Sequence, residues 1–163
     1  MLFFDILFFG ILLIVAYIDF KTHYIYDCHL IIASVIVAGM LLYSGGDWID
    51  SIEGAVAGFL IGYLMYKIAY LYYKEEAFGF GDVLLLAVLG FYFGLYGFFS
   101  CFSITYMLLG VILIVPIIVK PSIVRMSVPM APVYVIGALV YKFMGSPGLI
   151  EFLYDLQRMQ FLG

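Results

Sequence analysis

Long apolar runs alternate with short polar breaks along this chain, a pattern typical of a protein built from membrane-spanning helices. A helix needs about 20 residues to cross about 30 Å of hydrocarbon. The stretch from Val83 to Val119 contains no charged residue and suits two helices with a tight turn near residues 94–97. We therefore predict six spans, at about 2–18, 29–43, 52–73, two within 83–119, and 128–144.

The end of the chain follows a different pattern. Leu149, Leu153 and Leu156 recur at helical spacing, with Glu151 and Arg158 among the other positions. This spacing is typical of a short amphipathic helix that lies on the membrane surface. The predicted fold is all-α: a polytopic bundle of about six transmembrane helices at 1–147, followed by an interfacial tail at 148–163.

The composition supports a membrane location and limits the partners. Hydrophobic residues make up 67% of the chain and charged residues 11%, against about 25% charged residues in an ordinary soluble domain. The net charge of −4 argues against a nucleic-acid partner, whose phosphates need clustered lysines and arginines. Cys28 and Cys101 belong to no Cys/His cluster, so we predict no structural zinc site.

Basic residues gather on one side of the predicted bundle: Lys21, Lys67, Lys74, Lys120 and Arg125. The other side holds the acids Asp5, Asp47, Asp50 and Glu53, with the bases Lys142 and Arg158. Lysine and arginine mark the cytoplasmic side of membrane proteins. We therefore predict that the first side is cytoplasmic and that both termini lie outside.

Small residues recur at four-residue spacing in two predicted spans. Gly54, Gly58 and Gly62 form overlapping GxxxG steps in the third, and Gly90 and Gly94 form another in the fourth. Such residues let helices approach closely in lipid. They predict close packing inside the bundle, with a dimer face as the alternative.

Two acids stand at ends of apolar runs on the predicted cytoplasmic side. Asp19 ends the first run, and Asp82 opens the fourth within AFGFGDVLLLAVLG (77–90). Acids near the bilayer are costly and often functional. When two carboxyl groups lie a few ångströms apart, one keeps its proton while the other is a base. Such a pair can activate water for peptide hydrolysis without a metal or a nucleophilic side chain.

The glycines before Asp82 allow two interpretations. Gly79 and Gly81 lack side chains, so the loop can approach another backbone or adopt a positive φ, and an extended substrate could pair with it. Alternatively, FGFGD is an ordinary turn and Asp82 is the N-cap of the fourth span.

The segment AFGFGDVLLLAVLGFYFG (77–94) resembles the GxGD motif of type IV prepilin peptidases, aspartic proteases of the bacterial inner membrane. In that family Ile-Pro-Asn follows the first aspartate at the distance that separates Asp19 from Ile25. The stretch VPMAPVY (128–134) is similar to the Ile-Pro-Phe-Xaa-Pro element that opens the family's last span. The three segments agree in order and spacing and together cover most of the chain.

This chain also departs from the family pattern. Tyr26 and Asp27 replace the usual proline and asparagine, and Val83 stands where a lysine often follows GxGD. The paired CxxC motifs of the family's long members are absent. The resemblance is therefore to the short, peptidase-only members, which implies no S-adenosylmethionine chemistry, no zinc and no other cofactor.

By resemblance, the chain is an aspartic endopeptidase that removes the basic leader from a prepilin or pseudopilin at the cytoplasmic membrane face. The resemblance implies that Asp19 and Asp82 form the catalytic dyad. We further predict roles in binding the substrate or shaping the site for Gly79, Gly81, Asp27, Glu75, Glu76, Pro129 and Pro132. Among these, the three acids would attract the basic leader, and the prolines would shape the start of the last span.

Four alternatives remain open. The chain could be a preflagellin peptidase of the archaeal type or a peptidase for tight-adherence pilins. It could be a non-catalytic relative that binds pilin-like helices, as the substitutions at Tyr26 and Asp27 allow. It could also be a small transport subunit with Asp19 and Asp82 as an ion relay. A relay would need acids in the middle of the spans, however, and the sequence has none there.

Overall fold

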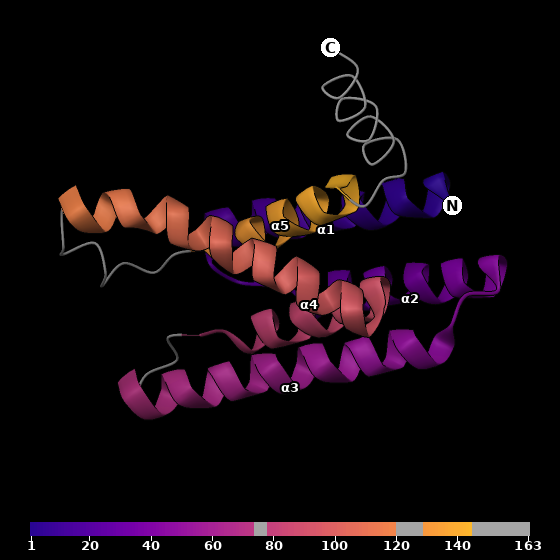
Figure 1. Ribbon diagram of the computed structural model, residues 1–163, viewed down its shortest axis with the longest axis horizontal. Coiled ribbons are helices and arrows are strands. Elements are labelled where there is room, and N and C mark those ends of the chain that lie inside the picture. The colour runs from indigo at the N-terminus through magenta and orange to yellow at the C-terminus, as the bar shows by residue number, and fades with distance from the viewer. Residues whose placement is uncertain (74–77, 120–128, 145–163) are drawn as a thin grey trace, which may run out of the picture.

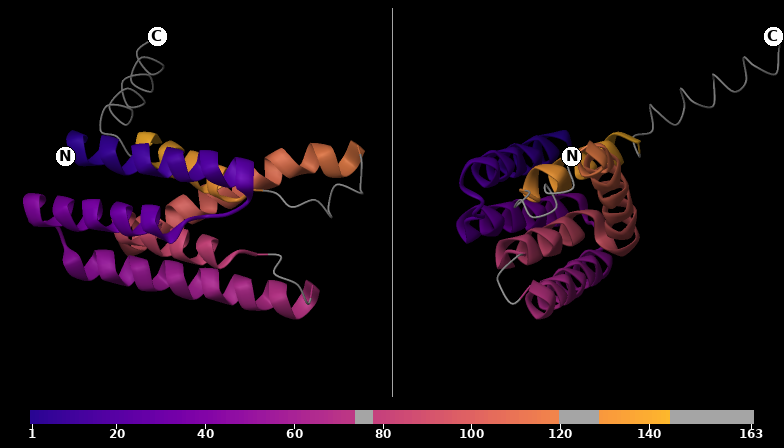
Figure 2. Two further views of the ribbon diagram at one scale, coloured as in Figure 1. Left: turned by 180° about the vertical axis from the view of Figure 1, so that it is seen from behind. Right: turned by 90° about the vertical axis from the view of Figure 1, so that its left-hand side faces the viewer.

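The computed structural model describes residues 1–73, 78–119 and 129–144 (Figure 1). These residues form α1 (Leu2–Thr22), α2 (Asp27–Ser44), α3 (Trp48–Tyr73), α4 (Phe80–Val119) and α5 (Ala131–Met144). None of the described residues lies in a strand, so the all-α prediction is confirmed for them. Successive helices run back and forth along the long axis of the molecule (Figures 1 and 2).

Helix α4 bends sharply at Gly94, where φ is 71° and ψ is −178°. The segments on either side, 80–93 and 95–119, double back along each other in both views (Figures 1 and 2). A side chain at Gly94 would collide with the carboxylate of Asp50, which accepts a hydrogen bond from the Leu95 amide at 3.0 Å. Asp50 of α3 thereby caps the second arm of α4, and the turn predicted near residues 94–97 is a bend at one glycine.

Four of the described helices are long and apolar enough to cross a membrane: α1, α2, α3 and α4. Helix α5 has 14 residues, fewer than the roughly 20 that a span needs. The prediction of about six spans is therefore not confirmed. The two spans predicted between Val83 and Val119 correspond to the two arms of α4, which run in opposite directions on either side of Gly94 (Figures 1 and 2). The last predicted span is shorter than expected, since its described helix begins at Ala131.

Helices α3 and α4 pack through their glycines. A Cβ on Gly54 would collide with the backbone of Gly90, and one on Gly58 would collide with the backbone carbonyl of Leu86. One on Gly62, a turn further along α3, would lie 3.0 Å from a Cα of α4. The predicted packing inside the bundle is confirmed, because backbone approach this close leaves no room for another chain along the same glycines.

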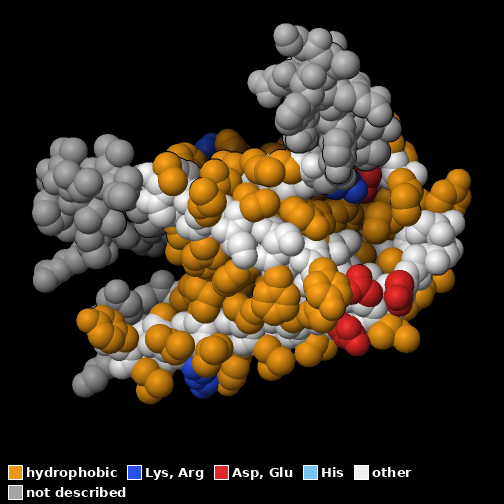
Figure 3. All heavy atoms as spheres, viewed as in Figure 1, with side chains coloured by type: hydrophobic (Ala, Val, Ile, Leu, Met, Phe, Trp, Pro, Cys, Tyr) orange, Lys and Arg blue, Asp and Glu red, His pale blue; other side chains and the backbone are white. Residues whose placement is uncertain are grey.

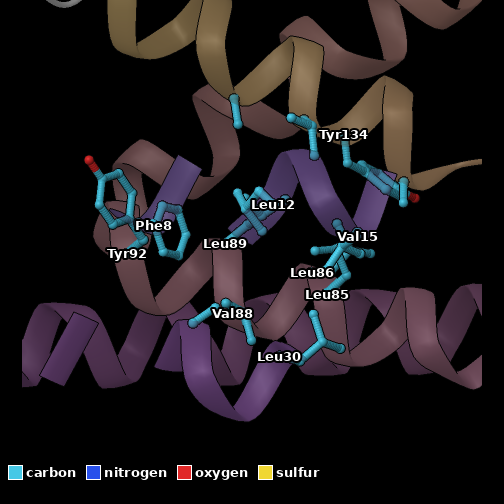
Figure 4. Packing of buried hydrophobic residues seen from close by; sticks show 14 of the residues in the cluster. Phe8, Leu12, Val15, Leu30, Leu85, Leu86, Val88, Leu89, Tyr92 and Tyr134 are labelled. Atoms are coloured by element: carbon cyan, nitrogen blue, oxygen red, sulfur yellow. The ribbon is translucent and has the colours of Figure 1, made fainter. Parts of the chain in front are cut away.

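The core lies where the first arm of α4 meets α1, α2 and α5. Leu85, Leu86 and Leu89 of α4 are fully buried against Leu12 and other apolar residues of α1 (Figure 4). At one end of this cluster the rings of Phe8 and Tyr92 stack with their centroids 4.1 Å apart. Because α4 is surrounded in this way, the position of its first residues is fixed by contacts on several sides.

The two ends of the bundle differ in chemistry. At the end near the N-terminus, Asp5 of α1 pairs with Lys142 of α5 at 3.2 Å, and both groups hydrogen-bond the Tyr92 hydroxyl of α4. Acidic side chains also gather there at the start of α3, while the surface between the ends is mostly apolar (Figure 3). We call this the Asp5 end and the opposite one, where α1 finishes and α4 begins, the Asp19 end.

Several predictions concern residues outside the described ranges. These are the acids Glu75 and Glu76, the bases Lys74, Lys120, Arg125 and Arg158, and the tail at 148–163. The domain division at residue 147 likewise stays a prediction.

Candidate active site

Asp19 and Asp82 both lie at the Asp19 end. Asp19 lies three residues before the end of α1, in its last turn, and is 5% exposed. Asp82 belongs to the first turn of α4. The two side chains are close enough to repel each other electrostatically. Two acids that are far apart in sequence thus lie at the same end of the bundle, as the predicted order of spans placed them, and their proximity to each other is a finding of the structure.

Asp19 also anchors helix α5. Its Oδ2 accepts a hydrogen bond from the Ala131 amide at 3.0 Å. The next residue, Pro132, has no N–H, and the amides of Val133 and Tyr134 bond to the carbonyl of Met130. Ala131 therefore carries an amide of the first turn that needs a partner from outside the helix, and Asp19 supplies it.

This contact predicts different stabilities for two substitutions of Asp19. We expect Asp19→Asn to unfold at a higher temperature than Asp19→Ala, by about 1 kcal/mol in stability, the usual cost of losing a capping side chain. The asparagine oxygen can still accept the Ala131 hydrogen bond, and alanine offers no acceptor. Thermal unfolding in detergent measures the difference. Both variants remove the charge beside Asp82, so equal unfolding temperatures would mean that the cap contributes nothing.

The carboxyl group of Asp82 is less fully hydrogen-bonded than that of Asp19. Its backbone amide bonds to the Gly79 carbonyl at 3.1 Å, and its Oδ2 lies near Gly79. The other oxygen, Oδ1, is buried, and no described residue donates a hydrogen bond to it. A buried carboxylate oxygen is normally satisfied by a donor, so Oδ1 is suited to receive one from a water molecule or a substrate.

Gly81 lets the loop after α1 reach the start of α4. A Cβ on Gly81 would lie 2.7 Å from the Cβ of Ile25, which is itself buried. Of the two roles considered for the glycines, close approach therefore applies to Gly81. Positive φ does not apply, because the described glycines that adopt it are Gly45 and Gly94. Helix α4 begins at Phe80, so Asp82 lies inside the first turn and is not the N-cap.

Two tyrosines that the sequence did not single out stand beside the acids. Tyr106 comes from the second arm of α4 and Tyr134 from α5, and their hydroxyls are 2.9 Å apart. Tyr106 also contacts the sulfur of Met65 in α3 at 3.3 Å. Both tyrosines interact electrostatically with Asp82. No local sequence motif marks either tyrosine.

The other described residues that were predicted to belong to the site are Asp27, Pro129 and Pro132. Asp27 is exposed at the first residue of α2. Pro132 is the second residue of α5, as expected for a proline in a first turn, but Pro129 precedes the helix. Over the described ranges, no three or more His, Cys, Asp or Glu side chains gather in a way that could hold a metal ion.

Comparison with protein families decides the class of the molecule. The model of the type IV leader peptidase family matches residues 6–118, well over half of the chain. The chain belongs to the type IV leader peptidase family. Comparisons with curated proteins and with solved structures find no match.

As a member of the leader peptidase family, the molecule is a protease. Its described part contains four apolar helices that are long enough to cross a membrane. The matched residues contain both Asp19 and Asp82 and run through α1, α2, α3 and nearly all of α4. They end before α5, so the contact between Asp19 and Ala131 joins the matched part of the chain to the helix that follows it.

Proposed function

We propose that this leader peptidase is a membrane-embedded aspartic endopeptidase that removes the basic leader from prepilins or pseudopilins, with Asp19 and Asp82 as its dyad. One observation carries the proposal. The two acids come from different helices and lie within electrostatic reach of each other at one end of an apolar bundle. This is the arrangement that hydrolysis by paired carboxyl groups requires.

The reaction needs one ionised and one protonated carboxyl group. The ionised group takes a proton from water, and the oxygen of that water attacks the carbonyl carbon of the scissile peptide bond. The protonated group then donates its proton to the leaving nitrogen as the carbon–nitrogen bond breaks. The two acids titrate as a coupled unit, so the roles of acid and base belong to the pair.

The proposed location is the inner membrane, with the Asp19 end in the cytoplasm and both termini outside. The described bases Lys21 and Lys67 support it, because they belong to the last turn of α1 and the second half of α3, toward the Asp19 end. Acids gather at the other end (Figure 3). Positive residues favour the cytoplasmic side, where the leader of a precursor would lie.

The three acids predicted to attract the leader should affect substrate binding more than the chemical step. We expect replacement of Asp27, Glu75 and Glu76 by their amides to raise KM for a precursor with a basic leader about fivefold at low salt, with little change in kcat. Attraction between exposed charges raises local substrate concentration and is screened by salt. Initial rates at low and high salt test this. An unchanged KM at low salt would contradict the proposed attraction between these acids and the leader.

The function itself is tested by direct cleavage. The purified chain is incubated in detergent or proteoliposomes with a synthetic precursor, made of a basic leader that ends in glycine and a following hydrophobic helix. We expect mass spectrometry to find the free leader and a helix that begins directly after the glycine. Binding without cleavage would instead favour the non-catalytic relative, and cleavage elsewhere in the precursor would contradict the proposed specificity.

A further inference from the structure

An apolar groove runs between α1 and α5 on the outside of the bundle, with a cavity volume of about 300 Å³. Its α1 wall consists of Leu13, Ala16, Tyr17 and Phe20. These positions follow the i, i+3, i+4, i+7 spacing, which places them on one face of the helix. The wall therefore extends for about two turns along α1.

The opposite wall of the groove has the same spacing. It consists of Pro132, Val135, Ile136 and Leu139 of α5. Two helices thus present matched apolar stripes along a shared hollow. Such a hollow accepts a third apolar helix, which inserts side chains at the same spacing.

One end of this groove lies at the candidate active site. Phe20 directly follows Asp19 in α1, and Pro132 directly follows Ala131 in α5. The amide of Ala131 is the group that hydrogen-bonds Asp19, at 3.0 Å. The last residues of both walls therefore flank one carboxyl group of the proposed dyad, and from there the groove extends along both helices toward the Asp5 end.

We propose that this groove binds the hydrophobic helix of the precursor that is cleaved, an inference that rests on the proposed function. A helix lying in the groove would have its first residues beside Asp19 and the rest of its length along α1 and α5. The peptide bond just before that helix would then reach the dyad, while the leader continued beyond the Asp19 end. In lipid, matched packing is the main source of helix affinity, so the two stripes would select for a precursor with a helix.

The test compares two neighbouring residues of α1. Leu13 lines the groove and Ile14 does not, although they lie at the same depth and are 54% and 50% exposed. Leu13→Trp would fill the groove, and Ile14→Trp adds the same ring on a neighbouring face. Each full-length variant is given two substrates: the synthetic precursor, and a short peptide with the same leader and junction but no helix.

We expect Leu13→Trp to lower the ratio of kcat/KM for the precursor to kcat/KM for the peptide by about tenfold, the typical effect of losing one anchor from an interface. Ile14→Trp should leave that ratio within about twofold, the scatter of surface substitutions. Equal ratios in the two variants would overturn the groove assignment. Wild-type protein that cleaves neither substrate would instead overturn the proposed function, so the two failures can be told apart.

A second measurement does not depend on how the tryptophan variants fold. A photoreactive amino acid at position 136, in the α5 wall, is expected to cross-link to the helix of the precursor. The same group at position 14 serves as the control. Cross-links from position 136 to a second copy of this chain, or to lipid alone when precursor is present, would overturn the proposal.

Discussion

Asp19→Asn and Asp82→Asn are each expected to abolish leader removal, with kcat/KM lowered by about a thousandfold or more, as when one member of a catalytic unit is removed. Asparagine has nearly the shape of aspartate but can neither take a proton from water nor give one to the leaving nitrogen. Since Asp82 and Asp19 lie within electrostatic reach of each other, the loss of either leaves the other without its partner. Leader removal from the synthetic precursor provides the measurement.

The matched control for this pair is Asp47→Asn at the other end of the bundle. Asp47 accepts hydrogen bonds from the amides of Ile49 and Asp50 at the start of α3, and asparagine caps a helix about as well as aspartate. This variant should therefore cleave at the wild-type rate. Substantial cleavage by Asp19→Asn or by Asp82→Asn would contradict the dyad, whereas equal loss in all three variants would point to a general effect of removing charge.

Gly90→Ala is expected to destabilise the bundle by about 1–3 kcal/mol, the usual range for forcing extra atoms into a close-packed contact. The new methyl group would collide with the backbone carbonyl of Gly54, and a backbone atom in a helix has no rotamer through which to move. Helices α3 and α4 would have to separate, which would shift the arm that carries Asp82. The unfolding temperature in detergent and the cleavage rate should therefore both decrease.

The control for this substitution is Gly10→Ala. Gly10 lies within α1, and a Cβ there would meet nothing within 4 Å. Alanine favours a helix more than glycine does, so this variant should be as stable as the wild type or slightly more stable. A similar loss of stability in both variants would show that glycine itself, and not the contact with α3, accounts for the effect.

The sequence predicted the parts of the site that depend on local pattern and charge. The apolar run before Asp19 and the one after Asp82 identified two helix ends on the same side of the membrane, and the structure brings these ends together. The spacing of Gly54 and Gly58 likewise predicted where helices approach closely. In each case the information lies in one continuous stretch, because periodicity along a helix specifies which face is buried.

The sequence did not predict contacts made between distant stretches. Nothing near Tyr106 or Tyr134 indicates that their hydroxyls meet beside Asp82, because each lies in an ordinary apolar helix. The bend at Gly94 was expected as a tight turn, but its cap by Asp50 depends on how α3 packs on α4. The number of spans is not confirmed, because the described helix of the last predicted span has only 14 residues, and hydropathy alone does not specify where a helix begins.

The hydrogen bond from Ala131 makes the two acids unequal for anyone comparing members of this family. A chain that had lost its activity would still gain stability from an aspartate at position 19, because that side chain caps α5. Its presence is therefore weak evidence of a working enzyme. Asp82 has an oxygen that no described residue engages, so the fold gives less reason to retain it. Position 82 is the better marker for separating active peptidases from relatives that have kept only the scaffold.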